Sequence, residues 1–497
     1  MKSVAVIGAI SLALWGLMLW LSIGLPVGPG SELANGFGYD VPNNDTPTAA
    51  YFGLFALIWV GFAFCGWRVW KAASSWRLAW VIVCFGIGFR IFMLFSQPVH
   101  ENDFYRYLWD GKSLVHGFNP YLYEPAALWM NELDVEEPLL EPETGTWFQG
   151  RLWTEADDAR LKELRSLRDE NPEAYNRIGH SQIPTIYPPA AQAMFGVSSF
   201  FFGDSVVGFR VVLMVFDLAA MLLILCLLKQ LGRNPAWILF YAWSPLIIVE
   251  FANSAHLDIA PIAFTLLAIF CVGARKPASA AAGLVVGVLG KYFSGFLLPI
   301  LFRPNWRGIL IYGGCGAAIL AAFVPFFFWQ DAGIAQVFRG LTTYTEDWQN
   351  NSGAFLVIDQ ICGFIVPASE TSYLPAKIVV AVIFLGFIAW LAFTATPDHE
   401  TLVKKCFWVM TVFFVLNPTA FPWYFAWVVP FLCVFPRPSW LILMLTLQFY
   451  YLGFHDDYAI STAIWLGFPV INWLTWGIFA IVWGIEQVIV FKRRTVA

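Results

Sequence analysis

Residues 78–111 read LAWVIVCFGIGFRIFMLFSQPVHENDFYRYLWDG, and the change of character within this stretch decides the fold. The first part, Leu78–Ser96, is an apolar run long enough to cross a hydrocarbon layer of about 30 Å as a helix. The second part places two carboxylates, Glu101 and Asp103, just after that run, at the start of a long polar segment. The pattern predicts a membrane-spanning helix that ends at an aqueous surface carrying a Glu-x-Asp pair.

The whole chain has the composition of a protein that crosses a membrane many times. Of its 497 residues 59% are hydrophobic and only 13% are charged, whereas soluble proteins carry about 25% charged residues. We therefore expect an all-α polytopic membrane protein of roughly 12–14 transmembrane helices, forming a single domain over residues 1–497. The clear spans are predicted near residues 4–24, 51–68, 78–96, 205–228, 236–252, 258–274, 308–328, 374–395 and 463–490.

Broken helices are predicted in two further regions. Residues 278–302 contain Lys291 and Pro299, and residues 406–453 are interrupted by five prolines. Membranes tolerate such segments where they pack against protein or line a cavity. Inverted-repeat transporters are disfavoured because no internal repeat is visible.

The positive charges predict the orientation. Sixteen of the 29 Lys and Arg fall in one alternating set of connections, which the positive-inside rule assigns to the cytoplasm. The opposite set then faces outward, and its largest member, the loop 97–186, holds 17 Asp and Glu against 8 Lys and Arg. Within this loop subdomain, Thr154–Asp157 is typical of a helix start, and Asn171-Pro172 of its end. The formal net charge of −5 argues against nucleic acid as a partner.

Asp103 is the first candidate for chemistry. Asp103, Arg106 and Asp110 recur at helical spacing with aromatic residues between them, which predicts an interfacial helix with its rings towards lipid and its charges towards a site. A carboxylate there could take the proton of a hydroxyl group. The alternative is a solvated helix end, because charge costs little at the interface.

Three other outer segments supply candidate binding residues. The turn Gly117–Tyr123, with Asn119 and Tyr121, is rich in aromatic rings and suits either a carbohydrate surface or an interfacial belt. His256 and Asp258 occupy a short outer turn and could contact a phosphate or a sugar, or be ordinary turn residues. The Pro-rich segment Asn417–Tyr424 could close over a site or simply break two helices.

Three cations lie within or near apolar segments, where charges usually face the protein interior and are functional candidates. Lys291 follows two glycines in an apolar region, Arg90 lies inside the third span, and Arg210 lies near the outer end of its span. A lipid phosphate is the anion that Lys291 or Arg210 could bind. The alternatives are snorkelling to the interface or pairing with Asp217 or another buried acid. The sequence contains no Walker loop, dinucleotide fingerprint, His/Cys metal cluster or GxSxG motif, which disfavours ATP-driven transport and common soluble chemistries.

Together these segments resemble the bacterial polyprenyl-phosphate-dependent mannosyltransferase-like proteins of the GT-C superfamily. The resemblance is carried, in a consistent order over most of the chain, by ENDFYRYLWDG (101–111), GFNPYLY (117–123), TIYPPAAQ (185–192), SPL…E…NSAHLD (244–258, with Glu250 as the E), GKY (290–292) and NPTAFPWYFAW (417–427). It implies a GT-C-like fold with a large first outer loop, and a catalytic carboxylate that maps to Glu101 and Asp103. It also implies transfer of a hexose, with mannose favoured, from a polyprenyl-phosphate sugar to a lipid or glycan acceptor, with inversion.

This resemblance assigns roles to the candidates. Asp103 would deprotonate the acceptor hydroxyl, and Lys291, Arg210 or Arg106 would stabilise the departing phosphate. The set expected to bind substrate is Arg106, Asp110, Asn119, Tyr121, Tyr187, Arg210, His256, Asp258, Lys291, Trp423 and Tyr424. No cofactor is required, although a divalent ion (Mg²⁺ or Mn²⁺) bridging the Glu-x-Asp pair is compatible with the chemistry.

Two other functions are compatible with part of the pattern. A non-enzymatic flippase or transporter of lipid-linked glycans would explain the intramembrane cations and broken helices, but transporters place their sites near the midplane. A lipid-linked glycan polymerase or ligase would carry basic outer loops, whereas the main loop here is acidic. The expected location is a bacterial cytoplasmic membrane, with the site facing outward.

Overall fold

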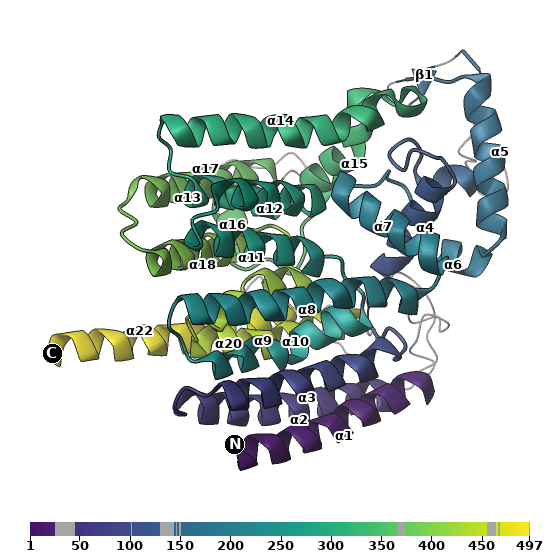
Figure 1. Ribbon diagram of the computed structural model, residues 1–497. Coiled ribbons are helices and arrows are strands. Elements are labelled where there is room, and N and C mark those ends of the chain that lie inside the picture. The colour runs from purple at the N-terminus through teal and green to yellow at the C-terminus, as the bar shows by residue number, and fades with distance from the viewer. Residues whose placement is uncertain are drawn as a thin grey trace.

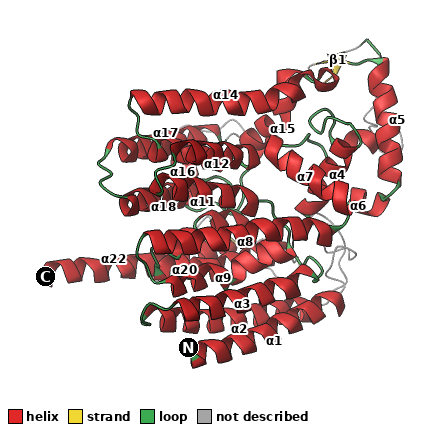
Figure 2. Ribbon diagram, viewed as in Figure 1, coloured by secondary structure: helices red, strands yellow, loops and turns green. Residues whose placement is uncertain are grey.

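Helices form nearly all of the secondary structure (Figures 1 and 2). The computed structural model describes residues 1–24, 45–100, 102–129, 144–145, 147–148, 151–365, 373–454, 464–465 and 468–496. Glu101, the first carboxylate of the predicted pair, lies outside the described residues. The prediction of an all-α protein needs one correction, because two small antiparallel hairpins are present. They pair β1 (Trp147–Phe148) with β2 (Arg151–Leu152) and β3 (Ile464–Trp465) with β4 (Phe468–Pro469).

Long apolar helices run in roughly the same direction across the molecule, from α1 at one edge to α14 at the other (Figure 1). They are α1 (Lys2–Gly24), α2 (Asp45–Trp70), α3 (Trp76–Leu94), α8 (Val206–Gln230), α14 (Trp306–Phe328) and α17 (Leu374–Phe393). In the described part of the chain, six helices are long and apolar enough to cross a membrane, or seven if one pair bent by 51° is a single span. Shorter apolar helices accompany them, and the larger number of 12–14 spans stays a prediction.

The span predicted near 236–252 is not one continuous helix. It divides into η3 (Pro235–Ile238), α9 (Leu239–Ala242), α10 (Pro245–Ile247) and η4 (Ile248–Asn253), with a bend of 51° before Pro245, which has no backbone N–H to continue the helix. The two regions that were predicted to be broken also consist partly of short helical pieces. The next elements are α11 (Ile259–Gly273), α12 (Pro277–Gly290), η5 (Tyr292–Leu297) and α13 (Leu298–Leu301). After α17 come α18 (His399–Leu416), η7 (Pro422–Trp427), α19 (Val429–Leu432), α20 (Pro438–Thr446) and η8 (Leu447–Phe454). Proline stands in the first turn of several pieces, where its missing N–H costs no helical hydrogen bond.

The predicted last span at 463–490 is wrong in its bounds. The hairpin of β3 and β4 occupies its start, and the helix forms only afterwards, through α21 (Val470–Asn472), the π-helix η9 (Trp473–Gly477) and α22 (Ile478–Val496). Proline at position 469 ends the hairpin and cannot donate a backbone hydrogen bond within a helix, which explains the late start.

Shorter elements gather at the end of the bundle away from the two termini (Figure 1). They are α4 (Asp103–Val115), η2 (Pro125–Trp129), α5 (Glu155–Asp169), α6 (Pro172–Asn176), α7 (Pro189–Phe202), η6 (Trp329–Asp331) and α15 (Gly333–Asp347). The short helix α16 (Ala354–Ile365) instead packs within the bundle against α17 and α18. The predicted helix start is confirmed in α5, where Thr154 and Asp157 form a capping box. Helix α15 was not among the helices predicted from the sequence.

Helix α4 confirms the helical spacing of Asp103, Arg106 and Asp110 but corrects the expected direction of its aromatic rings. Phe104, Tyr105 and Tyr107 are buried in the protein rather than turned towards lipid. Figure 1 shows α4 beside α7 at this end of the molecule, so the rings of α4 have protein neighbours to pack against.

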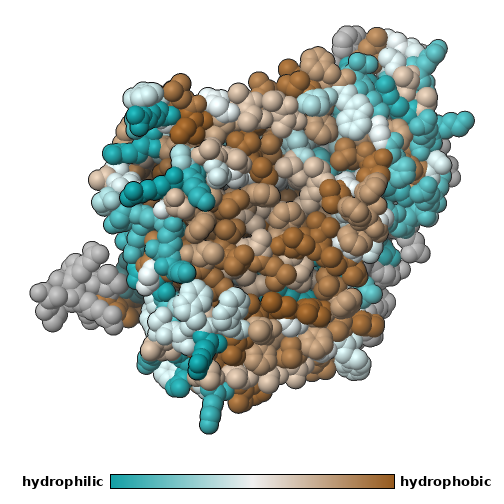
Figure 3. Space-filling view, in the orientation of Figure 1, coloured by the Kyte–Doolittle hydropathy of each residue, from teal (hydrophilic) through white to brown (hydrophobic). Residues whose placement is uncertain are grey.

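The surface divides into three zones along the long helices. Figure 3 shows a hydrophobic band across the middle, with hydrophilic residues concentrated at the two ends. The connections α2–α3, α8–η3 and α17–α18 lie at the end that carries both termini, which we call the terminal end (Figure 1). Many of the basic residues used for the topology prediction belong to these connections. The band has the character expected of a surface in contact with lipid.

Candidate functional site

Asp103 stands in the first turn of α4, at the end of the bundle opposite the terminal end. Its side chain is 28% exposed, and its Oδ2 atom accepts a 3.4 Å hydrogen bond from the hydroxyl of Tyr107. Burial raises the pKa of the Asp103 carboxyl above its ordinary value, although the charges of His180 and Lys291 act in the opposite direction. The group thus combines partial access from solvent with a raised affinity for protons, which suits a base.

Lys291 and Asp258 form an ion pair at the ends of two neighbouring helices. Asp258 immediately precedes α11, and Lys291 immediately follows α12. The ammonium Nζ donates hydrogen bonds of 2.7 and 2.9 Å to the two carboxylate oxygens of Asp258. The indole N–H of Trp427 donates to the same carboxylate at 2.7 Å. Both side chains are nearly inaccessible, at 12% and 1% exposure, so the charges compensate each other inside the protein.

His256 lies between Asp103 and a second buried carboxylate. Its Nδ1 atom is 4.0 Å from Asp103 Oδ2, and its Nε2 atom is 3.4 Å from Glu250 Oε2. The imidazole stacks on the Trp423 ring, with centroids 3.9 Å apart and planes 12° from parallel. The residue before it, Ala255, has φ of 59°, a left-handed conformation that costs energy for a residue with a Cβ and is concentrated at functional sites.

Glu250 is the acid that the sequence interpretation did not select. It lies in the π-helix η4 and is fully buried. Its carboxylate accepts hydrogen bonds of 3.0 Å from the Tyr451 hydroxyl and 3.4 Å from the Gln448 amide. One signal in the sequence could have found it, because an acid inside an apolar run is a functional candidate. The structure adds a second, since π-helices are frequent at functional sites.

Aromatic side chains form a wall around Lys291 and Asp103. The Lys291 ammonium lies 4.1 Å from the ring centroid of Tyr424, whose hydroxyl is 2.8 Å from that of Tyr344. On the Asp103 side, the Tyr187 ring packs edge-on against Tyr107 with centroids 5.1 Å apart. Cations are attracted to ring faces, so this wall favours positive charge at the site. Tyr344 comes from α15 and was not predicted.

Arg106 and Asp110 bond mainly to other groups of the protein, although Arg106 Nη2 has no hydrogen-bond partner among the described residues. Arg106 Nε donates to Asp110 Oδ1 at 2.8 Å, and its Nη1 donates to the carbonyl oxygen of Ile183 at 3.0 Å. Gln192 donates to the other oxygen of Asp110 at 3.1 Å. These bonds attach α4 to the 183–192 segment. The pair therefore holds Asp103 in place through its helix rather than standing free to bind a ligand.

The turn Gly117–Tyr123 is not the exposed aromatic surface that the sequence suggested, because Phe118, Asn119 and Tyr121 are buried. The Asn119 amide donates to the carbonyl oxygens of Phe326 and Trp329 at 3.0 and 2.9 Å. The Tyr121 hydroxyl donates to the Tyr187 carbonyl oxygen at 2.6 Å. The turn thus fastens the junction of α14 and α15 to the site segment.

The side chain of Arg210 also forms its hydrogen bonds within the protein. Its guanidinium donates to the carbonyl oxygens of Leu94 and Ser96, where α3 ends, and to that of Asn253. The suggested partner Asp217 is instead paired with Arg90 of α3. Arg210 therefore joins the end of α3 to the end of η4, immediately behind the turn that carries His256.

The described residues contain no group of three or more His, Cys, Asp or Glu side chains placed to hold a metal ion. The divalent ion considered from the sequence would need Glu101 beside Asp103, and Glu101 lies outside the described residues.

Comparison with protein-family models, with curated proteins and with solved structures finds no match to this chain.

Proposed function

We propose that this chain is a polyprenyl-phosphate-dependent glycosyltransferase of GT-C type. In this proposal it transfers a hexose, with mannose favoured, to an acceptor hydroxyl of a lipid or glycan at the outer face of a bacterial cytoplasmic membrane. The apolar helices that could cross a membrane fit a lipid-linked donor. The sequence resemblance supplies the donor class, and the site geometry supports the assignment of the base.

One observation carries the proposal. Asp103 is a partly exposed carboxylate whose Oδ2 atom lies 4.0 Å from the buried imidazole of His256, and the charge of Lys291, a cation that is 12% exposed, acts on it. A base needs access to the substrate, while a cation that assists a leaving group works best where water is excluded. Purely structural ion pairs do not require a third, accessible carboxylate beside them.

The proposed reaction is an in-line displacement at the anomeric carbon. The acceptor oxygen forms a bond to this carbon while the bond to the phosphate oxygen breaks, so that the configuration inverts. Asp103 takes the hydroxyl proton, and the leaving polyprenyl phosphate carries the electron pair away. Lys291 has three N–H donors, and its bonds to Asp258 use two of them, so that the third can serve the phosphate.

The aromatic residues of the site have two different roles: some position other side chains, and others are candidates for contact with substrate. Trp423 is only 5% exposed and stacks with both His256 and Phe421, so it positions the imidazole rather than receiving a sugar. Tyr187 is partly exposed and neighbours Tyr107 and Asp103, which makes it the better candidate for contact with the sugar or acceptor.

The decisive experiment compares Asp103→Asn with Asp204→Asn. The two aspartates lie at the same end of the bundle and have side-chain exposures of 28% and 26%, but Asp204 pairs with Lys112 away from the site. Purified proteins would receive a panel of radiolabelled polyprenyl-phosphate sugars, with membrane lipid extract as the acceptor. We expect Asp103→Asn to lose about 100-fold or more in transfer, the contribution of a general base, and Asp204→Asn to retain it.

The transport alternative gives a different result in the same preparations. Movement of lipid-linked sugar across a reconstituted bilayer, without transfer from any donor of the panel, would favour a flippase. Two of the three cations that motivated this alternative, Arg90 and Arg210, have structural partners, since Arg90 pairs with Asp217 and Arg210 binds backbone carbonyl oxygens.

A further inference from the structure

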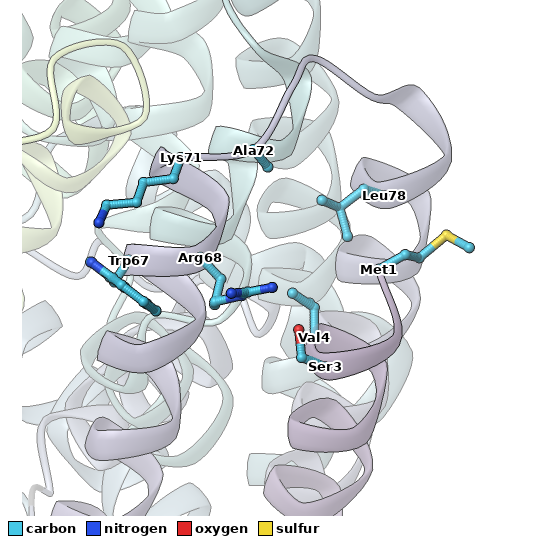
Figure 4. A pocket seen from close by; sticks show the side chains of 8 residues that line it. All are labelled: Met1, Ser3, Val4, Trp67, Arg68, Lys71, Ala72 and Leu78. Atoms are coloured by element: carbon cyan, nitrogen blue, oxygen red, sulfur yellow. The ribbon is translucent and has the colours of Figure 1, made fainter.

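A pocket lies at the terminal end, between the start of α1 and the loop that joins α2 to α3 (Figure 4). Its volume is about 180 Å³, whereas one water molecule takes about 30 Å³ in the liquid. The lining side chains are Met1, Ser3, Val4, Trp67, Arg68, Lys71, Ala72 and Leu78. The pocket is therefore large enough for a tetrahedral oxyanion, and it lies at the opposite end of the bundle from Asp103.

The charge of this pocket is positive. Arg68 and Lys71 line it, and its eight lining residues, all in the described part of the chain, include no Asp or Glu. Among the described residues neither cation has a carboxylate within ion-pairing distance. In Figure 4 the Arg68 guanidinium extends from α2 towards Ser3 and Val4, while Lys71 lies along Trp67. An anion entering here would meet a planar N–H fork and a hydroxyl donor.

The surroundings of the pocket are those of a membrane boundary. Trp67, Trp70, Trp76 and Trp80, in the last turns of α2 and the first turns of α3, are between 42% and 53% exposed. Exposed tryptophans of this kind are typical of the level of lipid head groups. Below them begins the hydrophobic band of the surface, so a ligand in the pocket could keep its phosphate at the cations and its chains against α1 and α3.

We propose that this pocket binds the phosphate of an anionic membrane phospholipid. Basic pockets between transmembrane helices recognise such head groups, and each Lys or Arg near a membrane surface adds about 1 kcal/mol of attraction. The Trp side chains at the pocket favour a lipid over free phosphate, because they place the site at the level of the head groups. The proposal stands independently of the glycosyltransferase proposal, since it concerns other residues at the opposite end.

The test measures retained lipid rather than activity. Full-length protein would be reconstituted in phosphatidylcholine nanodiscs containing phosphatidylglycerol and then transferred to neutral detergent, and the co-purified phosphatidylglycerol would be counted by native mass spectrometry. We expect Arg68→Gln and Lys71→Gln each to retain phosphatidylglycerol about fivefold more weakly than the wild type. Both side chains are exposed, so the fold should tolerate either change.

Arg77→Gln is the matched control, because Arg77 is an exposed cation of the same connection that does not line the pocket. Equal losses in Arg77→Gln and Arg68→Gln would indicate diffuse attraction and overturn the proposal, as would full retention by Arg68→Gln and Lys71→Gln. A parallel arm adds inorganic phosphate without phosphatidylglycerol. If phosphate alone raises the melting temperature of the wild type as much as the lipid does, the assignment to a lipid is wrong.

Discussion

The Lys291 ammonium contacts both carboxylate oxygens of Asp258, at 2.7 and 2.9 Å, although the two residues lie 33 positions apart. The pair closes the ends of α11 and α12 on the side of the bundle that carries Asp103. The indole N–H of Trp427 also donates a hydrogen bond to Asp258. The ion pair therefore supports the packing of the two helices. In the proposed mechanism its cation, Lys291, also stabilises the leaving phosphate, and the two roles need separate tests.

Substitutions of this pair separate stability from activity. Lys291→Met leaves Asp258 buried and unpaired, so we expect a loss of about 3–5 kcal/mol in the free energy of unfolding, together with loss of sugar transfer. The double variant Lys291→Met/Asp258→Leu removes both charges. We expect it to recover most of the stability, as measured by chemical denaturation in detergent, without recovering transfer.

The single variant Asp258→Asn provides the control, since it keeps the shape of the side chain and leaves the Lys291 cation available. Recovery of both stability and transfer in the double variant would show that Lys291 is a structural residue, and the cation that assists the phosphate would have to be sought elsewhere.

Arg90 and Asp217 form a second buried pair, which connects α3 to α8 within the apolar part of the bundle. The Tyr241 hydroxyl also donates to Asp217 at 2.7 Å. We expect Arg90→Leu to destabilise the protein by about 3–5 kcal/mol and Arg90→Leu/Asp217→Leu to lose much less. Thermal unfolding in detergent would measure both. Arg90 also donates to the backbone carbonyl oxygens of Gly86 and Ala242. Equal destabilisation of the two variants would indicate that these bonds contribute more to the free energy of unfolding than the ion pair does.

The sequence predicted that Asp103, His256 and Trp423 lie in outer segments at one end of the bundle, and the structure brings these three residues together. The reason is simple: helices that cross a bundle in alternating directions place every second connection at the same end. The prediction needed only the positions of the apolar runs and the basic residues between them. Lys291 was predicted only as a cation within an apolar, broken region, and its position beside Asp258 was not predicted.

The partner of each polar side chain was harder to predict, because it depends on tertiary distances. Arg106 and Asp110 were expected to face substrate, yet their i, i+4 spacing already favours an ion pair within the helix. Arg210 and Arg90 are both cations of apolar helices, and only the packing of α3 against α8 decides which of them reaches Asp217. Tyr344 lies in a helix that the hydrophobic pattern did not reveal.

The pH dependence of transfer should report the environment of Asp103. Burial raises its pKa above the ordinary value of about 3.9, and only the deprotonated carboxylate can accept a proton. We therefore expect kcat/KM to fall as the pH decreases through this raised pKa, so that the acid limb lies above pH 4. Asp204→Asn should show the same limb. A rate that stays constant down to pH 4 would argue against Asp103 as the titrating base.

Asn119 distinguishes a structural role from substrate binding. Its amide fastens the 117–123 turn to the carbonyl oxygens of Phe326 and Trp329, and its own carbonyl accepts the backbone N–H of Tyr121 at 3.1 Å. Asn119→Ala leaves these buried groups without partners, so we expect a loss of about 1–3 kcal/mol in unfolding free energy. The KM for the donor should remain unchanged when activity is measured on the folded fraction.

Tyr121→Phe serves as the comparison, because it removes only the hydroxyl that bonds to the Tyr187 carbonyl oxygen. If Asn119 contacts the sugar, its substitution should instead raise KM at least tenfold while the melting temperature stays constant. The structural role predicts the opposite pattern, since each polar atom of the Asn119 side chain already has a protein partner. Measuring both quantities on one preparation therefore decides between the sequence prediction and the geometry.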